Sequence, residues 1–400
     1  MIQTLEERLA RYPVKRYPVQ HATTQFHLGM ALSNQGRLPE ARVALETAAG
    51  IFSGRMPVEY AKALNALGAV LRMQARVSES TDAFRTAGSL FASAGLRAEE
   101  GAALYNLGLA QRDSGDVSGA ILSFHRAGEL FAEGNARAHA ASMRELGAAL
   151  LESGDMVRAI TTLRQAVKVA EDLGDQPGLG GAANVLGLAH LAADQPTDAV
   201  TAFRLSAAAN PRSLRPPEYA MAKANLALAF EMAADQPRAL LAAGQAAAVV
   251  SASEPVLSQA RELRARLGAR PGTLLVVLDR EPLESWPGLV REELARWVEL
   301  EQKECQQELA ALLTALYSSP RESDLAEAWL GALLELRPEA AEQMVRSLLK
   351  AMAAQEPEVR PILRQRLGSG MARFHLPQWE RLKDLFNRMA VEQGTEASWT

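Results

Sequence analysis

The chain has 400 residues, with 43 Lys and Arg against 47 Asp and Glu, so its formal net charge is −4. This balance excludes a protein that grips nucleic acid through a basic field over its whole surface. A hydrophobic content of 48% with 22% charged residues excludes wholesale disorder. A single cysteine excludes an intrachain disulfide framework. The sequence has no long uncharged apolar run and a polar N-terminus, so neither a membrane span nor a signal peptide is predicted. We therefore expect a cytoplasmic protein.

The composition is uneven along the chain. Residues 1–272 carry 28 Lys and Arg against 26 Asp and Glu, whereas residues 273–400 carry 15 against 21. Arginine far outnumbers lysine in the first part, which is typical of GC-rich bacteria. All five tryptophans follow residue 280, at Trp286, Trp297, Trp329, Trp379 and Trp399. Two compositions in one chain predict two domains.

Two columns of residues repeat at a fixed period. A Leu-Gly or Leu-Ala pair recurs every 39 or 40 residues, and a large apolar residue follows its small residue by 16 positions. The small residues are Gly29, Gly68, Gly108, Gly147, Gly187 and Ala227, and the large ones are Leu45, Phe84, Phe124, Leu163 and Phe203. Small residues lie four positions before and three after each large one, which places them on one helical face. Gly- and Pro-containing breakers separate the columns, so each unit is predicted to be an antiparallel helix pair, present about six times.

These residues resemble the tetratricopeptide repeat, whose first helix carries Leu-Gly and whose second carries Ala, Phe and Ala. The resemblance covers about residues 20–255 and implies an all-α, right-handed solenoid of helical hairpins. The usual period is about 34 residues, so the spacing here indicates an elongated variant. We expect a lead-in at 1–19, a solenoid at 20–271 that ends in a capping helix from about Pro255 to Leu267, and an α-helical domain at 272–400.

The resemblance also implies that the first helices line the concave side of the solenoid. Offsets of −6, −3, +1 and +4 from each small residue share one helical face. Asparagine there can pair with the backbone of an extended peptide, and arginine can bind a carboxylate. The predicted partner is a protein or peptide segment, and a basic centre made by Lys62, Arg72, Arg112 and Arg144 would suit an acidic one. The candidate binding residues are Phe26, Lys62, Asn65, Arg72, Tyr105, Asn106, Arg112, Arg144, Asn184 and Asn225. The alternative is that these side chains are solvated or pair with nearby Glu and Asp.

Beyond residue 272 the repeat stops. The β-branched run from Thr273 to Leu278 predicts a short strand or an extended linker. Apolar residues from Leu294 to Leu316 recur at helical spacing and predict one long helix. We expect about five helices packed as a bundle, with most of the tryptophans in its core.

The sequence carries no motif of known catalytic chemistry. It has no Walker A loop, no nucleophile elbow and no HExxH, so neither a cofactor nor a metal is predicted. Three glutamates at helical distances from Cys305 disfavour a thiolate. The leading hypothesis is a non-enzymatic scaffold or adaptor. Two alternatives stay open: a peptide- or ligand-responsive regulator, and an enzyme with a site in residues 273–400.

Overall fold

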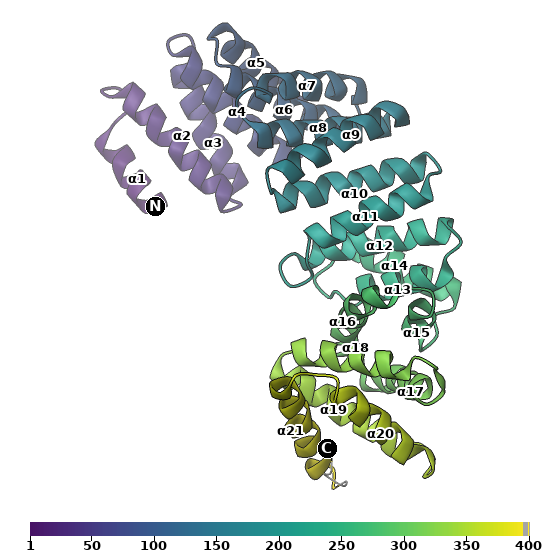
Figure 1. Ribbon diagram of the computed structural model, residues 1–400. Coiled ribbons are helices and arrows are strands. Elements are labelled where there is room, and N and C mark those ends of the chain that lie inside the picture. Colours follow the sequence, from purple (N-terminus) through teal and green to yellow (C-terminus); the bar gives the residue numbers. More distant parts are fainter. Residues whose placement is uncertain (395–398, 400) are drawn as a thin grey trace. The chain divides into compact units, whose positions relative to one another are not determined.

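A computed structural model describes residues 1–394 and residue 399, and every regular element in these residues is a helix (Figure 1). The all-α prediction is confirmed. The chain forms two compact units, Met1–Ala209 and Asn210–Thr400. No helix among the described residues is both long and apolar enough to cross a lipid bilayer.

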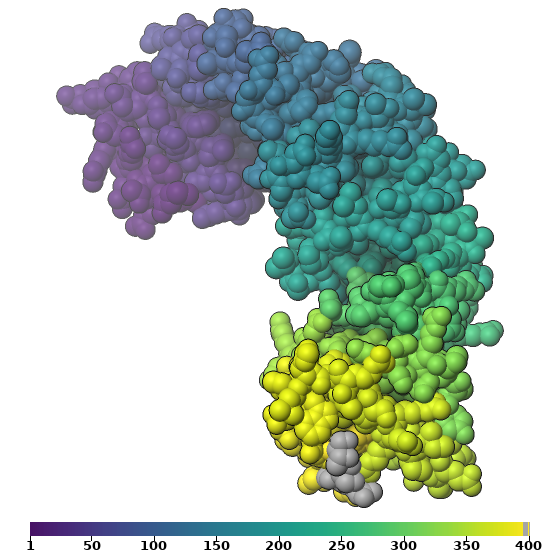
Figure 2. All heavy atoms as spheres, in the orientation of Figure 1, coloured from purple at the N-terminus to yellow at the C-terminus, as the bar shows by residue number. Residues whose placement is uncertain are grey.

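The first unit consists of one leading helix and five helix pairs. Each pair packs against the next along the row, and the space-filling view shows their side chains as a continuous mass from purple to teal (Figures 1 and 2). The leading helix is α1 (Ile2–Arg11), which places a helix in the predicted lead-in. The pairs are α2 (Pro18–Asn34) with α3 (Leu38–Phe52), α4 (Pro57–Met73) with α5 (Val77–Ser93), α6 (Arg97–Asp113) with α7 (Val117–Phe131), α8 (Ala136–Glu152) with α9 (Met156–Asp172), and α10 (Gln176–Ala192) with α11 (Pro196–Ala209).

The two repeating columns of the sequence meet inside each pair. A Cβ atom built on Gly108 would lie 2.7 Å from Cε1 of Phe124, and one built on Gly187 would lie 2.5 Å from Cε1 of Phe203. Both rings are fully buried. Glycine in the first helix therefore leaves the volume that the large residue of the second helix fills, and this contact sets how closely the two helices approach.

The turn inside every pair has the same geometry. It contains one residue in the left-handed region, and the next residue donates its amide to the carbonyl five positions back, as Asp116 does to Gln111 at 2.8 Å. This arrangement closes the end of the first helix. The left-handed residues are Gly36, Ala75, Gly115, Gly154, Asp194 and Ala234.

The second unit begins with the sixth pair and continues into the C-terminal helices. Its helices are α12 (Pro216–Met232), α13 (Gln236–Ala247), α14 (Glu254–Leu267), α15 (Thr273–Leu278), the 3-10 helix η1 (Leu283–Ser285), α16 (Trp286–Trp297), α17 (Gln302–Ser318), α18 (Glu322–Glu335), α19 (Pro338–Ala353), α20 (Val359–Met371) and α21 (Leu376–Glu392). A helix lies where the capping helix is predicted: α14 packs on α12 and α13 and is followed by Gly268 with a φ of 68°.

Two predictions for the C-terminal helices are wrong. Residues 273–278 form the helix α15 instead of a strand or linker, because Leu274, Val277 and Leu278 lie on one helical face and are buried, and α15 packs on α13 and α16. The predicted long helix is two helices, α16 and α17. Eight residues separate Trp297 from Cys305, a spacing that suits two continuous turns but here spans a break with both residues buried.

Tryptophans form much of the core of the second unit, as expected. Trp286, Trp297, Trp329 and Trp399 are at most 3% exposed. Leu241 of α13 belongs to the same hydrophobic cluster, so the last repeat helix and the C-terminal helices share a core. The boundary at residue 272 marks the end of the repeat pattern and stays a prediction for where separately folding parts meet.

Candidate functional site

The first helices of successive pairs are neighbours in the first unit. The helix α2 contacts α4, α4 contacts α6, and α8 contacts α10. Side chains at offsets −6, −3, +1 and +4 on these five helices, together with those that pair with them, form what we call the first-helix face. Polar groups of neighbouring helix pairs contact each other along it.

Two asparagines bridge α4 and α6. Asn106 Nδ2 donates to Asn65 Oδ1 at 3.1 Å, and both side chains are half-buried. This bond uses one acceptor and one donor of the four groups that the two amides offer. The Asn65 amino group and the Asn106 carbonyl oxygen make no other hydrogen bond within the described residues. The pair therefore presents a donor and an acceptor side by side.

Ion pairs connect three successive first helices. Arg72 of α4 pairs with Asp113 of α6 at 2.5 Å. Arg112 of α6 pairs with two carboxylates of α8, Glu145 at 2.6 Å and Glu152 at 3.4 Å. These contacts run from one helix pair to the next, so opposite charges of neighbouring pairs bind each other along this face.

A third contact joins α6 to α8 through an aromatic ring. The Tyr105 hydroxyl hydrogen-bonds to Arg144, and Arg144 also binds Glu145 at 2.8 Å. Burial and the charge of Glu145 raise the pKa of the Tyr105 phenol. Burial lowers the pKa of Arg144, but Glu145 and Tyr105 outweigh it, so the net shift is upward. The phenol therefore stays neutral and the guanidinium stays charged, and together they connect α6 to α8.

The predicted basic centre is largely neutralised. Arg72, Arg112 and Arg144 each bind a carboxylate, which is the alternative that the sequence left open. Lys62 is exposed and makes no ion pair within residues 1–394 and 399. The face therefore offers charges of both signs, with Lys62 as a cation at its edge.

Other predicted residues take no part in these contacts between first helices. Phe26 of α2 packs against the N-terminal hydrophobic cluster. Asn184 of α10 is only 6% exposed, and Asn225 of α12, in the second unit, is 9% exposed. Little of either asparagine side chain is therefore open to a partner.

Sequence reasoning missed the acidic half of this face and its apolar part. Asp113 and Glu152 follow Arg72 and Arg112 by 41 and 40 residues, so opposite charges one repeat apart were the available signal. Half-buried leucines at the +1 and +4 positions continue the face onto the later helices. They are Leu109, Leu151, Leu188 and Leu191.

Comparisons with known proteins concern the fold. No protein-family model and no curated protein matches the chain. Among solved structures, a Podosopora anserina putative kinesin light chain with nearly identical TPR-like repeats is 20% identical with a TM-score of 0.41, over 52% of this chain and 96% of that one. PilF of Pseudomonas aeruginosa is 16% identical with a TM-score of 0.46, over 61% and 97%. The apo form of RapI is 13% identical with a TM-score of 0.46, over 82% and 99%.

The fold is that of a tetratricopeptide-like repeat protein. Six helix pairs at a period of 39–40 residues define it, and in the first five a small residue of the first helix lies against a large residue of the second. Solenoids of this kind typically bind protein or peptide segments on extended surfaces and are usually non-catalytic.

Proposed function

We propose that this protein is a non-enzymatic interaction scaffold that binds an extended peptide segment of a partner protein along the first-helix face. The observation that carries the proposal is the Asn65–Asn106 pair. Its remaining donor and acceptor match the C=O and N–H that an extended peptide displays. A backbone-directed contact of this kind holds a peptide without selecting its side chains.

The groups around the asparagines define the preferred side chains. Lys62 favours a carboxylate on the partner, and the half-buried Leu109 and Leu151 favour an apolar residue. The paired arginines can bind a second acidic residue only if it replaces a carboxylate of the chain itself. We therefore expect a partner segment with few charges, one of them acidic, next to an apolar residue.

The non-catalytic assignment is part of the proposal. In the second unit, Arg291 binds Glu335 and Arg373 binds both Asp324 and Glu327, at 2.6–3.0 Å. These three carboxylates are therefore members of ion pairs. No group of three or more His, Cys, Asp or Glu in the described residues is placed to hold a metal ion. Cys305 is buried, and burial raises the pKa of its thiol, which disfavours a nucleophilic role.

Peptide selection tests the proposal without a known partner. Peptides would be selected from a random display library with the full-length protein, and their dissociation constants measured by fluorescence polarisation. Replacing both Asn65 and Asn106 with alanine is expected to weaken binding about tenfold or more, because each lost hydrogen bond contributes about 1 kcal/mol.

The control removes two polar side chains from α5, which lies between α4 and α6 in the chain. Ser89 and Ser93 of α5 are exposed and bond only to their own helix backbone, at 3.0 Å and 2.8 Å. Their double alanine variant is expected to bind the selected peptides as the parent does, with both variants unfolding at the parent temperature. Unchanged dissociation constants for the asparagine variant would show that the peptides bind elsewhere.

A further inference from the structure

A cleft of about 280 Å³ opens in the second unit between η1, α16, α18 and the segment between α20 and α21. Its floor is α18, where Ala328, Gly331 and Ala332 expose little more than backbone. The Phe374 ring lines the cleft, and a Cβ atom added to Gly331 would meet that ring at 3.7 Å, an ordinary contact distance. The cleft is thus apolar and wide enough to receive a large side chain.

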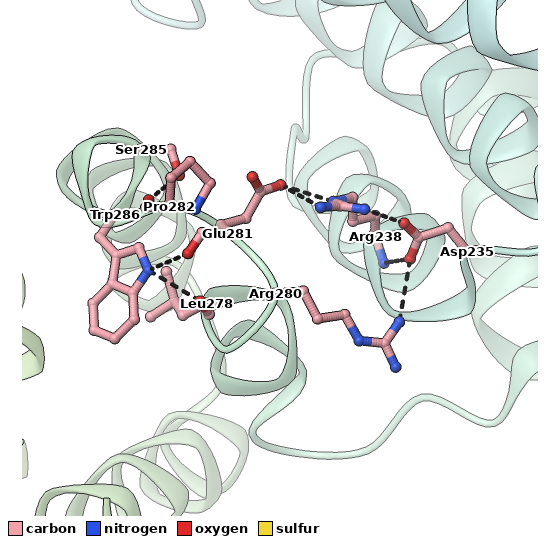
Figure 3. Close-up of polar contacts among 8 residues, drawn as sticks. All are labelled: Asp235, Arg238, Leu278, Arg280, Glu281, Pro282, Ser285 and Trp286. Carbon is pink, nitrogen blue, oxygen red and sulfur yellow. Dashed lines mark hydrogen bonds and ion pairs between the residues drawn. The ribbon is translucent and has the colours of Figure 1, made fainter. Parts of the chain in front are cut away.

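Trp286 of α16 also lines the cleft, and hydrogen bonds hold its almost fully buried indole in place. Its Nε1 donates to the carbonyl oxygens of Leu278 at 3.0 Å and Glu281 at 3.3 Å (Figure 3). The Glu281 carboxylate accepts from Arg238 of α13 at 2.8 Å, and Arg238 also binds Asp235. A hydrogen-bonded chain therefore ties Trp286 to the last repeat, so this side of the cleft is held in place before a ligand binds.

The rim of the cleft is acidic at both ends. Asp324 and Glu327 lie near the start of α18 and Glu335 at its end, whereas Arg291 is the one cation in the lining. Arg291 binds Glu335 at 2.6 Å with 54% and 50% of their side chains exposed. Arg373, outside the lining, binds Asp324 and Glu327 at 3.0 Å and 2.9 Å. Exposed pairs like these are weak, so a cation from a partner can take the place of either arginine.

We propose that this cleft is a second docking surface that binds a basic amphipathic helix of a partner protein, with a large apolar side chain inserted over Gly331. The charge around the cleft selects the occupant, because the three carboxylates of the lining are balanced by only two arginines, Arg291 and Arg373. Eight residues separate Glu327 from Glu335, which is about 12 Å along α18. The partner helix therefore carries Lys or Arg about two turns apart with the apolar anchor between them.

This surface goes beyond the proposed peptide site of the first unit, and it fits the opposite partner charge. A chain with both surfaces joins an acidic extended segment to a basic helix. The cleft and the first-helix face share no residue, so each is tested separately.

The test uses the full-length protein and a fluorescein-labelled helical peptide of about 15 residues. The peptide has lysines two turns apart and a phenylalanine between them, and a second peptide has glutamate at the lysine positions. Fluorescence polarisation is expected to show saturable binding of the lysine peptide and at least tenfold weaker binding of the glutamate peptide. No binding of the lysine peptide, or equal binding of both, overturns the proposal.

Two variants locate the binding. Gly331→Leu fills the cleft and is expected to weaken the lysine peptide at least tenfold, whereas Gly331→Ala adds one methyl group at contact distance and is expected to weaken it less than threefold. Glu335→Lys changes an exposed rim residue that the core does not need. It is expected to weaken the lysine peptide and strengthen the glutamate peptide. If Glu335→Lys changes neither affinity, the peptide does not lie in the cleft, whether or not Gly331→Leu folds.

Discussion

Replacing Arg296 with methionine is expected to lower the free energy of unfolding by about 3–5 kcal/mol. Arg296 is 6% exposed and lies between two buried carboxylates, Glu293 at 2.8 Å and Glu308 at 2.9 Å. Burial lowers the pKa of Arg296, but the two carboxylates outweigh it and the net shift is upward, so the guanidinium stays charged. Without it, two buried negative charges have no cation between them. Urea unfolding followed by circular dichroism measures the change.

The same cluster holds the start of α15. The second oxygen of Glu308 accepts from the Gly272 amide at 2.9 Å, immediately before that helix. The destabilisation is therefore expected to include the contact of the last repeat with the C-terminal helices.

A matched control lies five residues earlier on the same helix. Arg291→Met removes the exposed pair with Glu335 and is expected to change the stability by less than about 1 kcal/mol. Adding Glu293→Gln and Glu308→Gln to Arg296→Met is expected to restore most of the loss, because the buried charges go with the arginine. Equal effects of Arg291→Met and Arg296→Met would contradict the view that the inner cluster is desolvated.

The second large effect comes from one methyl group. Gly187→Ala is expected to destabilise the fold, because the new Cβ would lie 2.5 Å from the buried Phe203 ring and overpacking of this kind costs about 1–3 kcal/mol. The higher helix propensity of alanine offsets about 1 kcal/mol of that cost. Thermal and urea unfolding of the variant measure the net change.

Gly88→Ala is the control for this substitution. Gly88 is also buried inside a helix, but its Cβ would meet Ala103 at 3.8 Å, which is ordinary contact. This variant is expected to gain about 1 kcal/mol from helix propensity. Replacing the ring with Phe203→Ala removes the atoms that the new Cβ would meet, so it should remove the clash of Gly187→Ala, and the double variant should lose little more stability than Phe203→Ala alone. If both glycine variants shift stability in the same direction, the close contact does not set the helix spacing.

Periodicity made most of the repeat predictable. The 39–40-residue spacing of the two columns indicates where each pair starts and which residues of its two helices recur together. The C-terminal helices lacked a period. There Val276 and Val277 favoured a strand locally, while the burial of Leu274 and Leu278 on one face decided for a helix. Tertiary burial outweighed the local propensity, and a single sequence does not display that burial.

The candidate site was predictable in position and less so in charge. The helical offset predicts Asn65, and Asn106 enters as an immediate neighbour of that face; only the contact of α4 with α6 shows that the two bond to each other. Arg72 and Arg112 were counted as cations because their partners lie on the next repeat. Knowing which turn of one helix lies beside which turn of the next requires the stacking register, and the register follows from packing.

The contact between a small and a large residue in each pair also constrains how the chain can change over generations. Enlarging the glycine first produces a clash, and shrinking a phenylalanine to alanine first leaves a cavity that costs about 3–5 kcal/mol. A leucine in place of the phenylalanine does not by itself make room for the methyl group, since a Cβ built on Gly147 would lie 2.4 Å from Cγ of Leu163. Three combinations of residues occur at these two positions in the repeats of this chain: Gly187 with Phe203, Gly147 with Leu163, and, in the sixth pair, Ala227 with Ala243. The first helix can therefore accept a methyl group only after the second has given up volume, so substitutions at these positions have an order.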